Sequence, residues 1–143
     1  MKWALGVLIS LIAVVAVIAI AGTFLPVEHE ASRSAEFSRP PEVVYALISD
    51  LPNYPSWWPE NQTKVEVVEA LPPRRFMTRI VGESQFGGTW TMEIVRTASG
   101  SRLTITERGE VYNPVFRTLA RFVFGYTSTM ESCLAAAQRR LST

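Results

Sequence analysis

An uninterrupted apolar run near the N-terminus constrains this chain more than any other feature of its sequence. Residues 4–25 carry no charge and consist mostly of Val, Ile, Leu and Ala. A helix rises about 1.5 Å per residue, so the run reaches roughly 30 Å, the thickness of a bilayer core. Trp3 suits the lipid–water interface at one end, and Pro26 ends the helix at the other. We therefore expect a transmembrane anchor over residues 1–27.

A cleavable signal peptide is the alternative for the same run. Lys2 would be its basic start, and Ala19-Ile20-Ala21 has the spacing of small residues typical of a cleavage site. The run exceeds the usual apolar part of a signal peptide, about 7 to 15 residues, which favours the anchor. Lys2 lies closer to the run than Arg33 and Arg39 do on the other side, which slightly favours an N-terminus inside. We therefore expect a single-pass membrane protein with an extracytoplasmic domain.

Residues 28–143 are enough for one small domain and too few for two. Apart from Lys2, the chain has 13 Lys and Arg against 13 Asp and Glu, and such a neutral domain argues against a nucleic-acid partner. The single cysteine, Cys133, excludes an internal disulfide, and the single histidine, His29, excludes a zinc site rich in His or Cys. We expect no metal and no other cofactor.

The alternation of apolar residues predicts five strands in this domain. A short strand over residues 31–37 precedes a helix that begins at Pro41, with Ser38 as its cap. The tight Ser99-Gly100 turn joins the last two of four further strands as a hairpin. Because these four strands follow one another closely, we expect an antiparallel meander. They cover residues 64–70, 75–81, 89–97 and 102–111.

A long amphipathic helix is predicted after the last strand. Apolar residues recur at steps of three and four from Phe116 to Leu141, while Arg117 and Arg121 fall on the opposite side. Gly125 interrupts the pattern and permits a bend. We expect the apolar stripe to pack on the sheet, the one element large enough to cover it.

The loop between the first helix and the meander is rigid and aromatic. Residues 50–59 contain three prolines, with room for one helical turn. Tyr54, Trp57 and Trp58 add a large apolar surface, which must either cap the core or line an opening.

The order of these elements and two motifs resemble the SRPBCC or START-like superfamily, the polyketide cyclase/dehydrase and lipid transport family. The motifs are Ser-Arg-Pro-Pro-Glu-Val-Val-Tyr after the first strand and Tyr-Pro-x-Trp-Trp-Pro in the aromatic loop. The resemblance covers about residues 31–141. It implies an α+β helix-grip fold: a curved antiparallel sheet wrapped on a long C-terminal helix, here preceded by one N-terminal transmembrane helix. Members hold hydrophobic molecules between sheet and helix, although five strands instead of the common six or seven imply a smaller or closed cavity.

The candidate cavity lies between the strand at residues 89–97 and the last helix. Glu107 is its most informative residue, because alternation turns it inward with Leu103 and Ile105. An inward carboxylate needs an Arg, a Tyr hydroxyl or a polar group of a ligand, and Arg79 could be that Arg or could equally point outward. The alternatives are that a bulge turns Glu107 to solvent and that the apolar residues are plain core. The candidate ligand-binding residues are Trp58, Trp90, Met92, Glu107, Tyr112, Phe116, Tyr126 and Met130.

A binding role is favoured over catalysis. The sequence has no recognisable nucleophile motif, His29 has no evident link to the cavity, and Cys133 fits simple packing, so we assign no catalytic residue. We expect a membrane-anchored domain that binds or transfers a hydrophobic small molecule, such as a lipid, a quinone or a polyketide-like compound. One alternative is a module without a cavity that binds a protein partner through Tyr54, Trp57 and Trp58. The other is an enzyme of the cyclase or dehydrase type.

Overall fold

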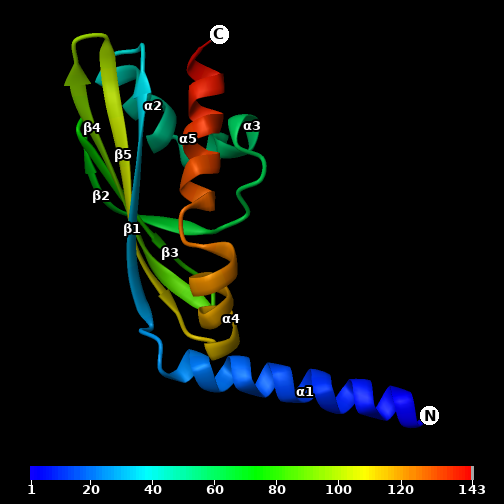
Figure 1. Cartoon of the computed structure of the whole chain (residues 1–143). Helices are drawn as coiled ribbons and strands as arrows, with labels where there is room; N and C mark the ends of the chain where they lie inside the picture. The colour runs from blue at the N-terminus through cyan, green and yellow to red at the C-terminus, as the bar shows by residue number, and fades with distance from the viewer. Residues whose placement is uncertain (143) are drawn as a thin grey trace.

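A five-stranded antiparallel sheet is the central element of the computed structural model, which describes residues 1–142 (Figure 1). The strand order is β1-β5-β4-β3-β2, so the four later strands form the predicted meander and β1 pairs with β5 at one edge. The predicted α+β helix-grip class is confirmed. The strands are β1 (Glu28–Phe37), β2 (Val65–Leu71), β3 (Arg75–Ile80), β4 (Phe86–Thr97) and β5 (Gly100–Val111).

Three strands begin earlier than the sequence predicts, and one of them, β5, begins at Gly100 in place of residue 102. β1 starts at Glu28, because pairing along the whole of β5 outweighs the poor strand propensity of its charged first residues. β4 starts at Phe86 in place of residue 89 and so includes Gly87 and Gly88. Gly88 has φ +128°, and a Cβ there would lie 2.2 Å from the carbonyl oxygen of Arg108. Glycine therefore lets β4 and β5 approach closely at this point.

β2 is one of the two edge strands of the sheet, and β1 is the other. The pairing of β2 with β3 shifts register between Val67 and Glu69, which is a β-bulge. Val67 and Val68 are exposed beside this bulge.

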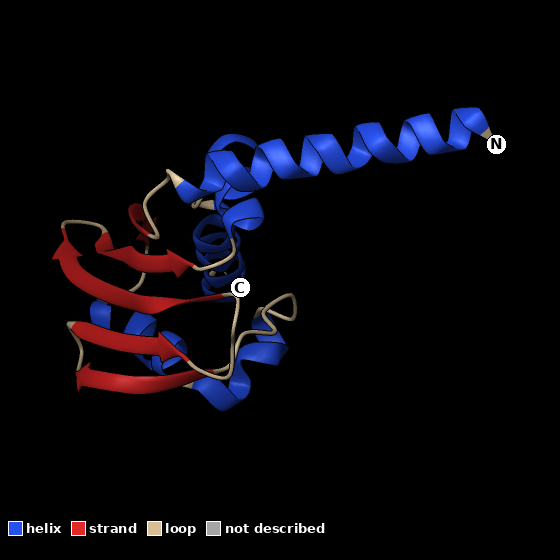
Figure 2. Cartoon of the chain, turned by 90° about the horizontal axis from the view of Figure 1, so that it is seen from below, coloured by secondary structure: helices blue, strands red, loops and turns tan. Residues whose placement is uncertain are grey.

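Helices cover one face of the sheet, and α1 (Lys2–Thr23) leads away from it (Figure 2). By length and composition α1 can cross a bilayer, a property that signal sequences share. α2 (Pro41–Ser49) follows β1; Pro40 precedes it without a side-chain cap, so the prediction that Ser38 caps this helix is wrong. The remaining helical segments are η1 (Leu51–Asn53), α3 (Tyr54–Trp57), α4 (Pro114–Leu119), the π-helical η2 (Ala120–Phe124) and α5 (Ser128–Leu141).

The predicted long C-terminal helix is divided in two. Gly125, with φ +71°, separates η2 from α5. Met130 and Leu134 of α5 are buried, whereas Phe116 and Val123 from the same predicted stripe are exposed. The prediction that the whole stripe packs on the sheet is therefore wrong for its first half.

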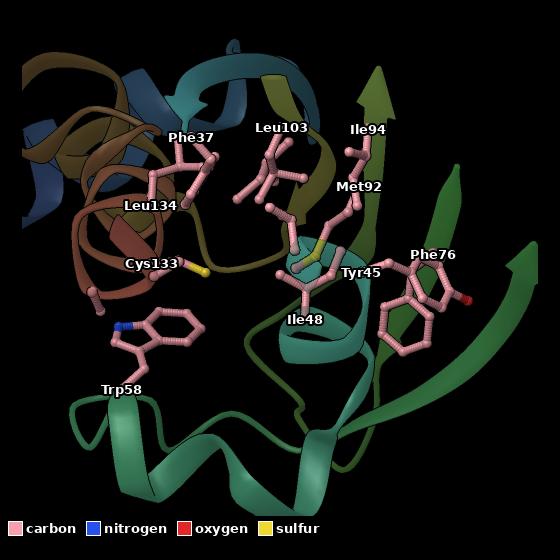
Figure 3. Packing of buried hydrophobic residues seen from close by; sticks show 14 of the residues in the cluster. Phe37, Tyr45, Ile48, Trp58, Phe76, Met92, Ile94, Leu103, Cys133 and Leu134 are labelled. Carbon is pink, nitrogen blue, oxygen red and sulfur yellow. The ribbon is translucent and has the colours of Figure 1, made fainter. Parts of the chain in front are cut away.

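The core lies between the sheet, α2 and α5 (Figure 3). Ile48 of α2, Leu103 and Ile105 of β5, and Cys133 of α5 have no exposed surface. Burial also raises the pKa of the Cys133 thiol to about 12, so the group stays protonated at ordinary pH. The predicted packing role of Cys133 is confirmed.

The C-terminal end of α1 is held by α4 through Arg117. The sequence predicts this arginine on the outer side of a helix, but it is buried. Its Nη1 donates to the carbonyl oxygens of Gly22 (2.8 Å) and Leu25 (3.3 Å). Its Nε and Nη2 donate to the carbonyls of Val111 (3.0 Å) and Tyr112 (2.9 Å). The guanidinium thus binds carbonyls at the end of α1 and just beyond it, of which that of Gly22 also accepts from the Leu25 N–H at 3.2 Å.

Candidate ligand cavity

A mainly apolar cavity of about 630 Å³ lies between the sheet and the segment formed by α4 and η2. Sites for small molecules commonly enclose about 300 to 1,000 Å³. Side chains from β3, β4 and β5, from the aromatic loop and from both sides of Gly125 form its wall. Six predicted ligand-binding residues line it, and their contact with a ligand stays a prediction: Trp58, Trp90, Met92, Glu107, Phe116 and Tyr126.

The other two predicted residues lie away from this wall. Tyr112 is exposed, and its hydroxyl donates to Glu110, a hydrogen bond that raises the pKa of the tyrosine. Met130 is fully buried in the core because α5 presses it against the sheet.

Glu107 turns inward, as alternation along β5 predicts, and both its oxygens accept hydrogen bonds. Trp90, directly opposite on β4, donates its indole N–H to Oε2, and Nε2 of His29 donates to Oε1 at 2.8 Å. The predicted partners, an arginine or a tyrosine hydroxyl, are wrong. Arg79 points outward and pairs with Glu66 at 3.2 Å on the exposed face of the sheet.

His29 is the functional candidate that the sequence prediction missed. It lies on the cavity wall, and its ring stacks on Tyr126 with 3.9 Å between centroids. Gly109 makes room for it, because a Cβ there would lie 2.5 Å from Nε2 of the histidine. The sequence did contain a clue to this position. His29 lies an even number of residues from Ala31 and Phe37, so it faces the same side of the sheet once the first strand begins at residue 28 in place of 31.

The pair formed by His29 and Glu107 makes one polar point in an apolar cavity. A carboxylate only accepts hydrogen bonds, so Nε2 of His29 is the donor in this pair. Nδ1 is buried and has no hydrogen-bond partner among residues 1–142. A carboxylate offers about four lone-pair sites, of which two are used here. Glu107 can therefore accept a further hydrogen bond from a hydroxyl or amide of a bound molecule.

The aromatic loop closes one end of the core. Tyr54, Trp57 and Trp58 are only 7%, 7% and 3% exposed. Trp58 stacks on Trp90 at 6.0 Å between centroids and donates its indole N–H to the Ser132 hydroxyl at 3.0 Å. The alternative prediction of an exposed protein-docking surface made of these three side chains is therefore wrong. The prediction of a domain without a cavity is wrong too.

A second hollow of about 720 Å³ overlaps the first at the edge of the sheet. Its wall carries the charged residues Glu28, Glu30, Arg79, Glu83 and Arg108. Such a polar surface suits water better than an apolar ligand, so we place the candidate site in the apolar cavity.

Solved structures share this arrangement of sheet and helices. A START superfamily protein from Mycobacterium smegmatis aligns over 80% of this chain and 97% of its own, with a TM-score of 0.64 and 18% identity. The fold is START-like. A protein from Mesorhizobium loti shares the START-like fold with the same coverage of both chains, a TM-score of 0.64 and 13% identity. The di-domain ARO/CYC StfQ from the steffimycin biosynthetic pathway aligns with a TM-score of 0.62 and 11% identity, covering 81% of this chain and 52% of that one.

The sequence of the START-like domain adds a family match. Residues 28–92 match the family described as polyketide cyclase/dehydrase and lipid transport. No curated protein matches the chain significantly. The family match and the fold together support the SRPBCC/START-like superfamily, and in general terms they support binding of a hydrophobic ligand or a role like that of a polyketide cyclase.

Proposed function

We propose that this START-like domain binds or transfers a hydrophobic small molecule, of the lipid, quinone or polyketide-like kind, at a membrane surface. The observation that carries the proposal is an apolar cavity with one hydrogen-bonded carboxylate on its wall. An apolar body gains free energy by leaving water, and a single polar point orients it. Because Glu107 accepts hydrogen bonds, the preferred ligand carries a hydroxyl or amide group.

The same proposal makes α1 a retained membrane anchor, with the N-terminus inside and the domain extracytoplasmic. The contacts at the end of α1 support retention. Thr118 donates to the carbonyl of Ile18 at 2.9 Å, and Arg117 donates to that of Gly22. Cleavage after Ala21 would remove part of this contact. A tethered domain also meets membrane-dissolved ligands at high effective concentration.

Photoaffinity labelling of the full chain in phosphatidylcholine vesicles tests the binding proposal. The probe is a long-chain alcohol that carries a diazirine, and peptide mass spectrometry locates its adducts. We expect adducts on peptides that contain Trp90, Met92 and Tyr126. Adducts on α1 alone would mean contact with surrounding lipid only and would overturn the proposal.

A matched pair of variants sharpens this test. Ala120 lines the cavity, so Ala120→Trp should fill it and lower cavity adducts several-fold. Val95 is exposed on β4, and Val95→Trp adds the same side chain far from the cavity. Adducts on α1 serve as an internal reference in both variants. Equal cavity labelling of the two variants would contradict the assignment.

Catalysis of the cyclase or dehydrase type is the second candidate, favoured by the pairing of His29 with Glu107 and by the likeness to an ARO/CYC protein. Such a pair can move a proton in a site of low polarity. Turnover of a poly-β-keto thioester that is lost in Glu107→Gln, with photolabelling retained, would favour catalysis. No turnover by the native chain would leave binding as the function.

A further inference from the structure

The segment formed by α4 and η2 carries an apolar surface that the domain does not cover. Phe122, Val123 and Phe124 are 70%, 67% and 66% exposed, and Phe116 is exposed beside them. Most soluble domains bury such aromatic side chains, and a contiguous exposed patch of them marks an interaction site. This patch, Phe116 with Phe122–Phe124, is called the apolar rim below.

We propose that the apolar rim enters the bilayer beside α1, so that the cavity opens onto the acyl-chain region and takes up its ligand directly from the lipid. The inference rests on the proposed function and names its membrane partner and its route of entry. The occupant of the rim is lipid acyl chain.

The contact between α1 and α4 determines how deep the apolar rim would lie in a bilayer that α1 crosses. Thr118 of α4 is bonded to the carbonyl of Ile18, which lies well inside the apolar run. From Ile18 to Leu25 a helix rises roughly 10 Å at about 1.5 Å per residue. α4 therefore lies alongside the last part of α1 rather than beyond its end (Figure 1). If α1 crosses a bilayer, α4 and η2 lie at the boundary between headgroups and acyl chains.

Close packing holds this geometry in place. Gly22 is buried, and a Cβ there would lie 1.9 Å from the carbonyl oxygen of Pro114 at the start of α4. The Arg117 guanidinium binds two carbonyls of the α1 end and two of the β5 end. α1 and α4 therefore move together, and the depth of α1 fixes that of the rim.

The charges of the segment fit an interfacial position. Arg117 is buried and donates its hydrogen bonds to backbone carbonyl groups, so its charge does not face lipid. Arg121 is exposed and forms no ion pair within residues 1–142. A long arginine side chain at this depth can extend to lipid phosphates while its neighbours lie in the acyl region.

The rim also borders the cavity. Phe116 and Phe124 belong both to the rim and to the cavity wall, and Gly125 and Tyr126 continue the wall beyond η2. An apolar molecule that leaves the acyl region beside Phe124 would reach the cavity without crossing water. This route avoids the free-energy cost of exposing the ligand.

Depth-dependent quenching of a fluorescent label tests the inference on the full chain. Val123→Cys and its control Val95→Cys are each labelled with a nitrobenzoxadiazole group, and native Cys133 is buried and stays unlabelled. The chains are reconstituted in phosphatidylcholine vesicles with brominated acyl chains. We expect blue-shifted emission and several-fold stronger quenching at position 123 than at position 95. Equal, weak quenching at both positions would overturn the membrane contact.

The entry route needs a second measurement, the rate at which the photoreactive alcohol labels the cavity. Phe122→Ser/Phe124→Ser should slow this labelling several-fold, whereas Val67→Ser/Val68→Ser on the exposed edge strand should leave it unchanged. Unchanged labelling in the first pair would overturn entry through the rim while leaving the binding proposal intact. Absence of cavity adducts in the native chain would instead overturn the proposed function.

Discussion

Glu107 ties three strands together at the candidate site, since it lies on β5 and accepts from His29 of β1 and Trp90 of β4. In Glu107→Ala both donors lose their protein acceptor at a largely buried site, where the side chain of His29 is 13% exposed. An unsatisfied buried donor costs about 1–3 kcal/mol, so we expect the free energy of unfolding to fall by about 2–4 kcal/mol. Urea unfolding of the full chain in detergent measures this change.

Glu66→Ala is the control for that measurement. Glu66 is likewise a paired carboxylate, but it and its partner Arg79 lie exposed on the outer face of the sheet. Exposed pairs contribute about 0–1 kcal/mol. Equal losses in the two variants would mean that the partners of Glu107 are as well hydrated as a surface pair.

Cys133 supplies a prediction on reactivity. Its pKa of about 12 keeps the thiol protonated at pH 8, and burial also blocks access. We expect iodoacetamide to leave the folded chain unmodified at pH 8 and to alkylate it fully in urea. Intact mass measures both states. Rapid alkylation of the folded chain would show that α5 opens readily from the sheet.

The residues of the site were predictable to the extent that local alternation controls them. Period two along β4 and β5 turns Trp90, Met92 and Glu107 to one face, and the structure agrees. His29 was missed because the charged start of β1 hides the strand, which forms only by pairing with β5. The partners of Glu107 were missed because they come from β1 and β4, and no local pattern records contacts between distant strands.

At the scale of elements, the joint between α1 and α4 depends on Gly22. In Gly22→Ala the new methyl group would collide with the backbone of Pro114, so α1 must move away from α4. We expect hydrogen exchange of the α4 amides to speed up several-fold. Gly6→Ala is the matched control, because nothing lies within 4 Å of its added Cβ. Unchanged exchange in Gly22→Ala would contradict close packing of the two helices.

The same joint explains why the last helix was predicted too long. Apolar periodicity continues from Phe116 to Leu141 on both sides of Gly125, so the sequence pattern cannot distinguish one bent helix from two helices with different neighbours. Only the part after Gly125 finds the sheet, while α4 packs on α1 and leaves its aromatic side chains exposed. The burial of Arg117 depends on carbonyls of α1, which lie far away in sequence.

At the scale of the whole molecule, α1 is an anchor if it stays in the mature protein and a signal peptide if it is cleaved off. We expect the chain isolated from membranes to keep residues 1–21, because α4 is built against the end of this helix. Intact mass spectrometry of the purified protein decides the matter. A mature chain that begins at Gly22 would lack the Thr118–Ile18 contact and most of α1, and would overturn the anchor.

The bulge in β2 has a consequence for how densely such chains can be crowded. Proteins confined to a membrane plane meet repeatedly with similar orientation, and a straight, free edge strand would let their sheets join into fibrils. The shift between Val67 and Glu69 breaks the regular ladder that an incoming strand would need on this edge. If α1 anchors the chain as proposed, this irregular strand would hinder the pairing of neighbouring copies through their β2 edges.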